Sequence, residues 1–296
     1  MNGSTPQAPA LASIRPRMNE ESLHVPESEA RFAFGKNWSA FLASVSEERI
    51  DKSCRAISDL LGTSDLRGHR FLDIGCGSGL SSLAARRLGA EVFSFDFDTD
   101  SVAATQALKQ RFEAEDSGWR VTQGSVLDEA FLKGLGQWDV VYSWGVLHHT
   151  GSMWQAIENA VRLVGPTGQF AVALYNDQGY ISDRWRWIKR NYVAHRWMRP
   201  FLVSASLVRI WGWTMLLDLK HLRPGHSWRE YGRERGMSAW HDLIDWVGGY
   251  PFEVAKPEEV FDFCRARGFT LERLITRQGR GCNEFCFRGG ASQTNA

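Results

Sequence analysis

A ten-residue segment in the first third of the chain constrains the fold more than any other part of the sequence. Residues 71–80 read Phe-Leu-Asp-Ile-Gly-Cys-Gly-Ser-Gly-Leu, an apolar strand that runs directly into a glycine-rich turn and then into residues with helical spacing. Glycine permits a positive φ and lets a ligand approach the backbone closely. The helix that follows presents free N–H groups at its start. The segment therefore predicts a ligand-binding strand–turn–helix unit.

Strands and helices alternate on the carboxyl side of this turn. Predicted strands span residues 70–75, 91–96, 119–124, 139–144 and 169–175, and predicted helices span residues 80–88, 101–112 and 153–164. A last helix at residues 257–268 and two last strands at 270–276 and 283–288 complete the pattern. Alternation of this kind is typical of βαβ units in a doubly wound parallel sheet with helices on both faces.

Two acidic residues indicate the chemistry of the ligand. Asp73 stands two residues before the first glycine of the turn, where it would repel a pyrophosphate but suits a cationic ligand. Asp96 ends the next strand, 17 positions after Gly79, which suits a carboxylate that takes both hydroxyls of a ribose. Phe97 is placed to lie against an adenine face. The third glycine comes one residue earlier than in the dinucleotide-binding pattern G-x-G-x-x-G, and Asp73 would repel a pyrophosphate. A nicotinamide dehydrogenase is therefore only a weak alternative.

At residues 72–79, 95–97 and 138–149 the sequence resembles the class I S-adenosylmethionine-dependent methyltransferases. It is most similar to the methyltransferase-11/12 type and to the ubiquinone-biosynthesis O-methyltransferases. The resemblance implies an α/β, Rossmann-like sheet of seven strands with helices on both faces, and S-adenosylmethionine as the methyl donor. It also implies that Asp73 and the glycines hold the methionine part of the donor, while Asp96 holds the ribose. The donor site expected from the turn and the resemblance comprises Asp73, Gly75, Cys76, Gly77, Gly79, Asp96, Phe97, Ser125, Val126 and Trp144.

One position departs from the family pattern. Ser125 stands where an acid often follows Gly124, so Asp128 or backbone groups are left to read the adenine amino group.

Two histidine sites are candidates for acid–base catalysis. His148 and His149 come just past a strand end, where ligands bind in open α/β sheets, and a neutral histidine can take a proton from an acceptor hydroxyl. The alternative is that they only hydrogen-bond their loop. His241 and Asp245 share one helix face, as an oriented base or as a surface contact. The acceptor pocket is expected to use Phe34, Lys36, Trp38, Tyr175, Asn176, Trp240, Asp245 and Tyr250.

The sequence divides into five predicted segments. Residues 1–27 are expected to be a disordered tail and residues 28–66 an N-terminal helical lid. The donor-binding core spans residues 67–176 and is followed by a helical acceptor-side insert at residues 177–256. Residues 257–290 return to the core with its final helix and strands.

The insert differs from the rest of the chain in charge and in tryptophan content. The whole chain has a net charge of +1, which excludes a generally basic nucleic-acid-coating protein. Residues 177–236 nevertheless hold twelve Lys or Arg and five acids, with six of the 13 Trp. The favoured interpretation is a set of amphipathic helices that cap the acceptor site. Peripheral membrane contact through residues 184–217 is the alternative, and RNA binding ranks lower because no RNA-binding motif accompanies the segment.

We therefore expect methyl transfer to a small or amphiphilic metabolite, with oxygen as the favoured acceptor atom. The alternatives are transfer to sulfur or nitrogen of a small carboxylate-bearing metabolite, or a non-enzymatic donor-binding module with a membrane or RNA partner. The five cysteines do not form a metal pattern, so no metal is expected. The absence of an apolar leader predicts a cytoplasmic protein. Residues 201–217, which Arg209 and Gly212 interrupt, are not expected to span a bilayer.

Overall fold

The fold is taken from a computed structural model that describes residue 42 and residues 45–113, 116–235, 239–279 and 281–290. The predicted tail and the predicted pocket residues Phe34, Lys36 and Trp38 lie outside the described residues.

The core is one seven-stranded sheet in the order β3-β2-β1-β4-β5-β7-β6. Its strands are β1 (Arg70–Ile74), β2 (Glu91–Asp96), β3 (Trp119–Gln123), β4 (Trp138–Trp144), β5 (Val164–Tyr175), β6 (Thr270–Ile275) and β7 (Cys282–Arg288). The first five strands run parallel, and β7 lies antiparallel between β5 and β6. The predicted seven-stranded α/β fold is confirmed. The strand order reverses between β1 and β4, and ligands bind at such a switch point, outside the carboxyl ends of the strands.

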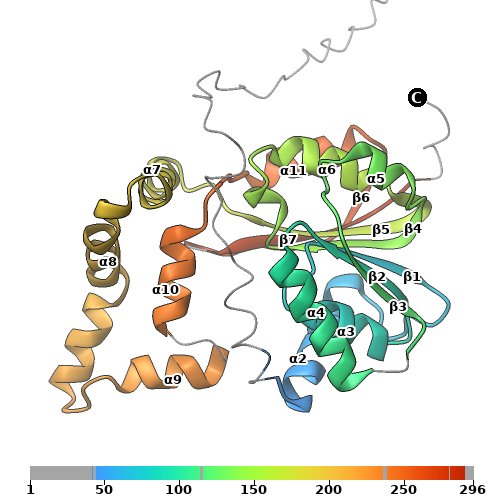
Figure 1. Cartoon of the computed structure of the whole chain (residues 1–296). Coiled ribbons are helices and arrows are strands. Elements are labelled where there is room, and N and C mark those ends of the chain that lie inside the picture. Colours follow the sequence, from blue (N-terminus) through green and yellow to red (C-terminus); the bar gives the residue numbers. More distant parts are fainter. Residues whose placement is uncertain (1–41, 43–44, 114–115, 236–238, 280, 291–296) are drawn as a thin grey trace, which may run out of the picture.

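Helices cover both faces of the sheet. Figure 1 shows α2 (Glu47–Leu61), α3 (Leu80–Arg87) and α4 (Thr99–Phe112) below the sheet. On the opposite face lie α5 (Glu129–Lys133), α6 (Met153–Val161) and α11 (Pro257–Arg265). Neighbouring residues of β1 point to opposite faces of the sheet: Phe71 packs in the cluster with α2 and α3, whereas Leu72 packs with α6 and α11. This period of two is what a strand buried on both faces requires.

The largest difference from the predicted boundaries is at the junction of α6 and β5. The helix expected to end at residue 164 ends at Val161, and β5 already begins at Val164 rather than at Gln169. Val164 pairs with Trp138, and the register shifts before Gln169 pairs with Val140. The intervening residues Gly165-Pro166-Thr167-Gly168 are typical of a turn, so the sequence predicts a strand only after them.

Four helices leave the sheet at one edge and form a separate layer. They are α7 (Tyr180–Ala194), α8 (Arg199–Lys220), α9 (His226–Arg235) and α10 (Ala239–Gly248), on the left of Figure 1. Leu202 and Val203 of α8 pack with Leu243 and Val247 of α10 in a small apolar cluster of their own.

This helical layer begins and ends at one point of the sheet. Asn176 forms a parallel bridge with Ala255. The Ala255 N–H donates to Tyr175 O at 3.0 Å, and the Asp177 N–H donates to Ala255 O at 3.2 Å. The layer is therefore held at its two ends by the same short piece of backbone pairing.

Candidate active site

A cavity of about 1290 Å³ lies between the carboxyl ends of the central strands and the four-helix layer. Typical small-molecule pockets measure roughly 300–1,000 Å³, so this cavity has room for two ligands side by side. Its two ends are chemically different. One is formed by the glycine turn and the end of β2, the other by α8, α9, α10 and the end of β5.

The glycine turn needs its glycines for backbone reasons. Gly75 and Gly77 have φ of 77° and 53°, and both line the cavity. A Cβ on Gly75 would also lie 2.3 Å from Val146 Cγ1, so no side chain fits there. Gly79 does not line the cavity. It precedes α3 in a left-handed conformation, with φ of 80°, and a Cβ there would lie 2.8 Å from Thr105 Cγ2. Its role is to turn the chain into the helix rather than to contact a ligand.

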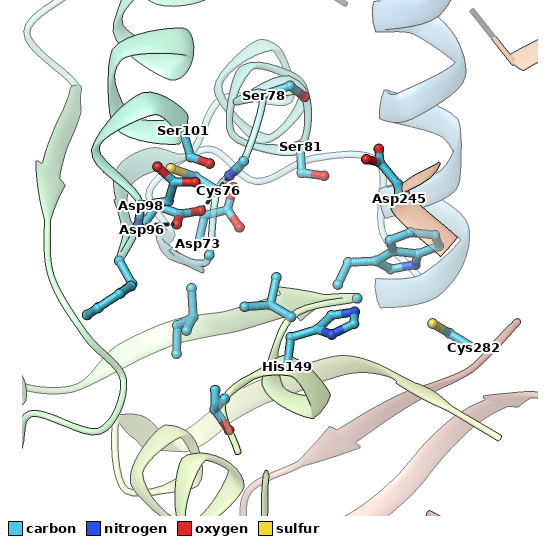
Figure 2. A pocket seen from close by; sticks show the side chains of 18 of the residues that line it. Asp73, Cys76, Ser78, Ser81, Asp96, Asp98, Ser101, His149, Asp245 and Cys282 are labelled. Atoms are coloured by element: carbon cyan, nitrogen blue, oxygen red, sulfur yellow. Dashed lines mark hydrogen bonds between the residues drawn. The ribbon is translucent and has the colours of Figure 1, made fainter. Parts of the chain in front are cut away.

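Three carboxylates gather at this end of the cavity, as Figure 2 shows for Asp73, Asp96 and Asp98. Asp96 is held in place by two backbone donors, because its Oδ2 accepts from the Gly77 N–H and its Oδ1 from the Asp98 N–H, each at 2.9 Å. Burial nevertheless raises the pKa of Asp96. A carboxylate fixed in this way presents its remaining lone pairs to a ligand beside the glycine turn.

Asp73 is the most deeply buried of the three acids. It is 2% exposed, and its Oδ2 accepts a hydrogen bond from Ser82 Oγ at 2.5 Å. Burial raises its pKa to about 7, against the effect of the Ser82 bond. A positively charged ligand in contact with Asp73 would offset the cost of ionising it there. This end of the cavity therefore suits a cationic ligand that also carries hydroxyl groups.

Most of the expected donor residues meet in the cavity. Its lining includes Asp73, Gly75, Cys76, Gly77, Asp96, Phe97, Ser125, Val126 and Trp144. Phe97 and Trp144 are 57% and 49% exposed, so both aromatic rings have open faces. Asp128 lies outside the lining. It caps α5 instead, where its carboxylate accepts from the N–H groups of Ala130 and Phe131.

The two adjacent histidines take different positions. His149 lines the cavity, and its ring is turned toward the open space in Figure 2. His148 does not line it: the side chain is fully buried, its Nδ1 accepts from the Tyr175 N–H at 3.3 Å, and its ring packs on Tyr175 with centroids 3.9 Å apart. The expectation that His148 is a catalytic group is corrected on this geometry, and the loop-bonding alternative describes it.

The hydrogen bond of His149 defines its tautomer. Nδ1 lies 2.6 Å from the carbonyl oxygen of Pro251. A carbonyl only accepts, so Nδ1 carries the hydrogen and Nε2 carries the lone pair in the neutral ring. Burial, with a contribution from the charge of Lys189, lowers the pKa of His149 to about 3. The imidazole is therefore neutral at physiological pH, with an acceptor nitrogen at the cavity.

A fully buried lysine stands behind this histidine. Lys189 of α7 is 0% exposed, and its Nζ donates to the Trp246 carbonyl oxygen. The Nζ also lies 4.3 Å from the Trp246 ring centroid and 4.8 Å from that of Phe252. Burial lowers the pKa of Lys189 to about 7. No sequence signal marked this residue, because arginines surround it along the chain.

The acceptor end contains part of the predicted set. Tyr175, Asp245 and Tyr250 line the cavity. Asn176 does not, because its side chain bonds Asn283 and the Arg277 carbonyl, and Trp240, 46% exposed, does not line it either. The side chain of His241 lies outside the described residues.

Sequence reasoning missed most of the cavity wall. The further lining groups include Ser81, Asp98, Ser101, Tyr142, Ile210, Trp211, Thr214, Tyr231, Asp242, Trp246 and Cys282. For the groups on α8, the tryptophan content of the insert was the signal, whereas the mixture of Trp, His, Asp and Tyr in residues 236–251 had marked the α10 segment as part of the acceptor pocket. Among the described residues that line the cavity, five are aspartates and none is lysine or arginine. The described residues also contain no group of three metal-ligating side chains.

Comparisons with known proteins agree with this geometry. A family profile described as a methyltransferase domain matches residues 45–241, about two thirds of the chain. A ubiquinone biosynthesis O-methyltransferase of Caulobacter sp. (strain K31) is 32% identical over 117 residues, which cover 39% of this chain and 44% of that protein. The enzyme of the same name from Rhodopseudomonas palustris (strain TIE-1) is 30% identical over 166 residues, 53% of this chain and 62% of that protein. The chain thus spans about half the length of these curated relatives.

A solved structure shares the fold at low sequence identity. Magnesium protoporphyrin IX methyltransferase from Synechocystis PCC 6803, crystallised with bound S-adenosylhomocysteine (SAH), superposes with a TM-score of 0.50. It is 15% identical, and the match covers 81% of this chain and 83% of that one.

Proposed function

Since the chain belongs to the family of class I S-adenosylmethionine-dependent methyltransferases, we propose that it moves a methyl group from S-adenosylmethionine to a hydroxyl oxygen of an uncharged, largely apolar acceptor. The observation that carries the proposal is the position of His149, whose neutral Nε2 is at the cavity between the acidic end and the aromatic end. S-adenosylmethionine supplies a methyl group on a positively charged sulfur that is already activated for transfer.

The residues at the acidic end fit such a donor. Asp96 would accept from the ribose hydroxyls, the glycine turn would allow close approach of its methionine part, and Asp73 would face its positive charge. Phe97 offers an open ring face for the adenine. These residues orient the donor so that its methyl group faces the acceptor end, and such positioning can supply about 7–11 kcal/mol of the barrier in favourable cases.

His149 would act on the acceptor. Its Nε2 takes the hydroxyl proton while the acceptor oxygen forms a bond to the methyl carbon and the carbon–sulfur bond breaks. Pro251 holds the ring in the required tautomer throughout. A pKa of about 3 makes His149 a weak base, which favours an acidic hydroxyl such as a phenol over an aliphatic alcohol.

The composition of the lining separates this proposal from the sequence-based alternative of a carboxylate-bearing acceptor. Carboxylates are usually bound by Arg or Lys. The described residues of the lining include neither, and Asp242 and Asp245 stand at the acceptor end. A negatively charged acceptor would meet repulsion there. The arginines of the insert do not contribute to the described lining.

Turnover tests the proposal. The purified chain is incubated with S-adenosylmethionine labelled in the methyl group, together with a panel of phenols, amines, thiols and a lipid extract. His149→Gln should lower kcat on a hydroxyl acceptor by about 10²–10⁴-fold while leaving SAH affinity unchanged. His69→Gln, at an exposed histidine outside the cavity, is the matched control.

Two results would contradict the proposal. Full turnover in His149→Gln would show that His149 is not the base. Tight donor binding with no labelled product from any acceptor would instead favour a non-enzymatic donor-binding module.

We also propose a cytoplasmic location, which the five free cysteines of the chain support, because disulfides are rare in that compartment.

A further inference from the structure

The outer side of α8 exposes large apolar side chains along its whole length. Phe201, Val208 and Leu219 are separated by seven and eleven residues, which returns each of them to nearly the same side of a helix. We call the following residues of α8 and of the turns on either side of it the outer stripe: Trp197, Phe201, Val208, Trp213, Leu216, Leu219 and Leu222, each between 60% and 88% exposed. Soluble monomers rarely leave so many apolar side chains exposed together, and such patches are typical of interaction surfaces.

The inner side of the same helix belongs to the active site. Ile210, Trp211 and Thr214 line the cavity, while Leu202 and Val203 pack with α10. The helix is therefore the wall between the acceptor end of the cavity and the outer stripe. Figure 1 shows α8 at the outer limit of the helical layer, away from the sheet.

The charge around the outer stripe identifies the partner. Residues 196–223, which contain the outer stripe, hold five Lys or Arg and one acid, Asp218. Asp218 is only 9% exposed, and both of its oxygens accept hydrogen bonds from Ser227 of α9. By contrast, Arg209 and Lys220 of α8 are exposed. Basic side chains beside exposed Trp and Leu are the composition of helices that lie in the interface of an anionic bilayer.

We propose that the outer stripe of α8 docks on the surface of a membrane that contains anionic lipids, with the helix parallel to the membrane plane. Indole rings such as those of Trp197 and Trp213 favour the headgroup region, and Arg209 and Lys220 reach the lipid phosphates. Docking places the wall of the acceptor cavity against the lipid, so the acceptor is a molecule dissolved in the bilayer. Only this last step rests on the proposed function; the docking itself does not.

Two other arrangements fit the structure less well. Among the described residues, α8 with its preceding turn is one stretch long and apolar enough to cross a membrane, by length and composition alone. If α8 crossed a membrane, its inner side would lose its contacts with α10 and would no longer line the cavity. A second copy of the chain would bring the same basic side chains against themselves in a two-fold contact, where like charges repel.

Co-sedimentation of the full chain with vesicles at low salt tests the proposal. The native chain should bind vesicles of phosphatidylcholine with phosphatidylglycerol more tightly than vesicles of phosphatidylcholine alone. The triple variant Phe201→Ser/Val208→Ser/Leu219→Ser should bind at least about tenfold more weakly, since three apolar side chains no longer enter the lipid. Leu274→Ser, at a 42% exposed leucine on β6, is the matched control and should bind as the native chain does.

A charge variant tests the electrostatic part. Arg209→Gln/Lys220→Gln should weaken binding to the anionic vesicles by about fivefold for each side chain neutralised, with little change on phosphatidylcholine. Unchanged SAH affinity in every variant shows that the fold is intact. Turnover of a water-soluble phenol should also be unchanged in the triple variant, whereas turnover of a vesicle-embedded acceptor should fall.

Several results would overturn the docking proposal. One is a native chain that fails to sediment with anionic vesicles at low salt, and another is a triple variant that sediments like the native chain. A native dimer that the triple variant converts to a monomer, with neither protein bound to vesicles, would assign the outer stripe to a second copy instead. Quenching of Trp213 by bromine atoms at the bilayer centre, measured against Trp213→Phe, would show a spanning helix.

Discussion

Replacement of Asp96 by asparagine tests the donor site most directly. The Asp96 carboxylate accepts from the Gly77 and Asp98 N–H groups, each at 2.9 Å, and these two bonds fix it beside the glycine turn. Alanine would leave both backbone donors without this acceptor and would disturb the turn itself. Asparagine keeps the shape and one acceptor oxygen, so Asp96→Asn removes the charge and one acceptor atom, and it leaves one of the two backbone N–H groups facing the amide NH2 group.

The expected loss of affinity follows from that difference. With the proposed ribose contact, Asp96 would accept from two ribose hydroxyls in addition to its two backbone donors. The amide group of asparagine can accept through only one of its two terminal atoms. A hydrogen bond to a charged group contributes about 1.5–3 kcal/mol, so losing one ribose bond should cost at least that much, or roughly 10- to 150-fold in Kd.

Isothermal titration calorimetry with SAH measures this effect without turnover. The control is Asp128→Asn, at an aspartate that caps a helix through its Oδ1 alone, which asparagine retains, and that lies outside the cavity lining. The control should bind SAH with the native Kd, and thermal unfolding should show that both variants are folded. A Kd for Asp96→Asn within about twofold of the native value would refute the ribose assignment.

Two further predictions concern buried groups that titrate near neutral pH. Burial depresses the pKa of Lys189 from 10.5 to about 7, so the native chain should gain stability as the pH rises from about 7 toward 10, by up to about 5 kcal/mol, and Lys189→Met should not. Urea midpoints across this range measure the difference, and a flat native curve would contradict the prediction. Burial raises the pKa of Asp73 from 3.8 to about 7, so the empty protein should lose stability as the pH rises from about 4 to about 7, and a cationic donor offsets that loss. Affinity for S-adenosylmethionine should therefore increase as the pH rises toward about 7 and level off above it, and Asp73→Asn should remove this dependence in calorimetric titrations; a native Kd independent of pH would count against a contact between Asp73 and the positive charge.

The donor half of the site was predictable because its determinants are local. Strand β1, the glycine turn and α3 are consecutive in sequence, and the apolar run of β1 with its glycines leaves few alternatives for the backbone. Asp73 and Asp96 stand at the ends of adjacent parallel strands, whose carboxyl ends meet at one edge of the sheet. Their proximity follows from the topology alone.

The acceptor half was not predictable because it depends on packing between distant segments. Trp211 and Trp246 reach the same cavity only because α8 packs against α10, and helical periodicity does not say which helices are neighbours. Lys189 stands among arginines in the sequence, and nothing local distinguishes it, but in the fold Trp246 and Phe252 enclose it. His148 and His149 differ through their contacts with Tyr175 and Pro251, which a pair of adjacent histidines in a sequence cannot reveal.

The pairing of Asn176 with Ala255 has a consequence for how such enzymes diversify. The chain leaves the sheet and returns to it at one clamp, so the length and content of everything between these residues do not enter the register of β5 with β7. The intervening residues can therefore vary in length without moving the strands, provided that Pro251 and Glu253 keep their contacts with His149, His148 and Met153. A change of acceptor then requires changes mainly between these fixed points rather than substitutions throughout the core.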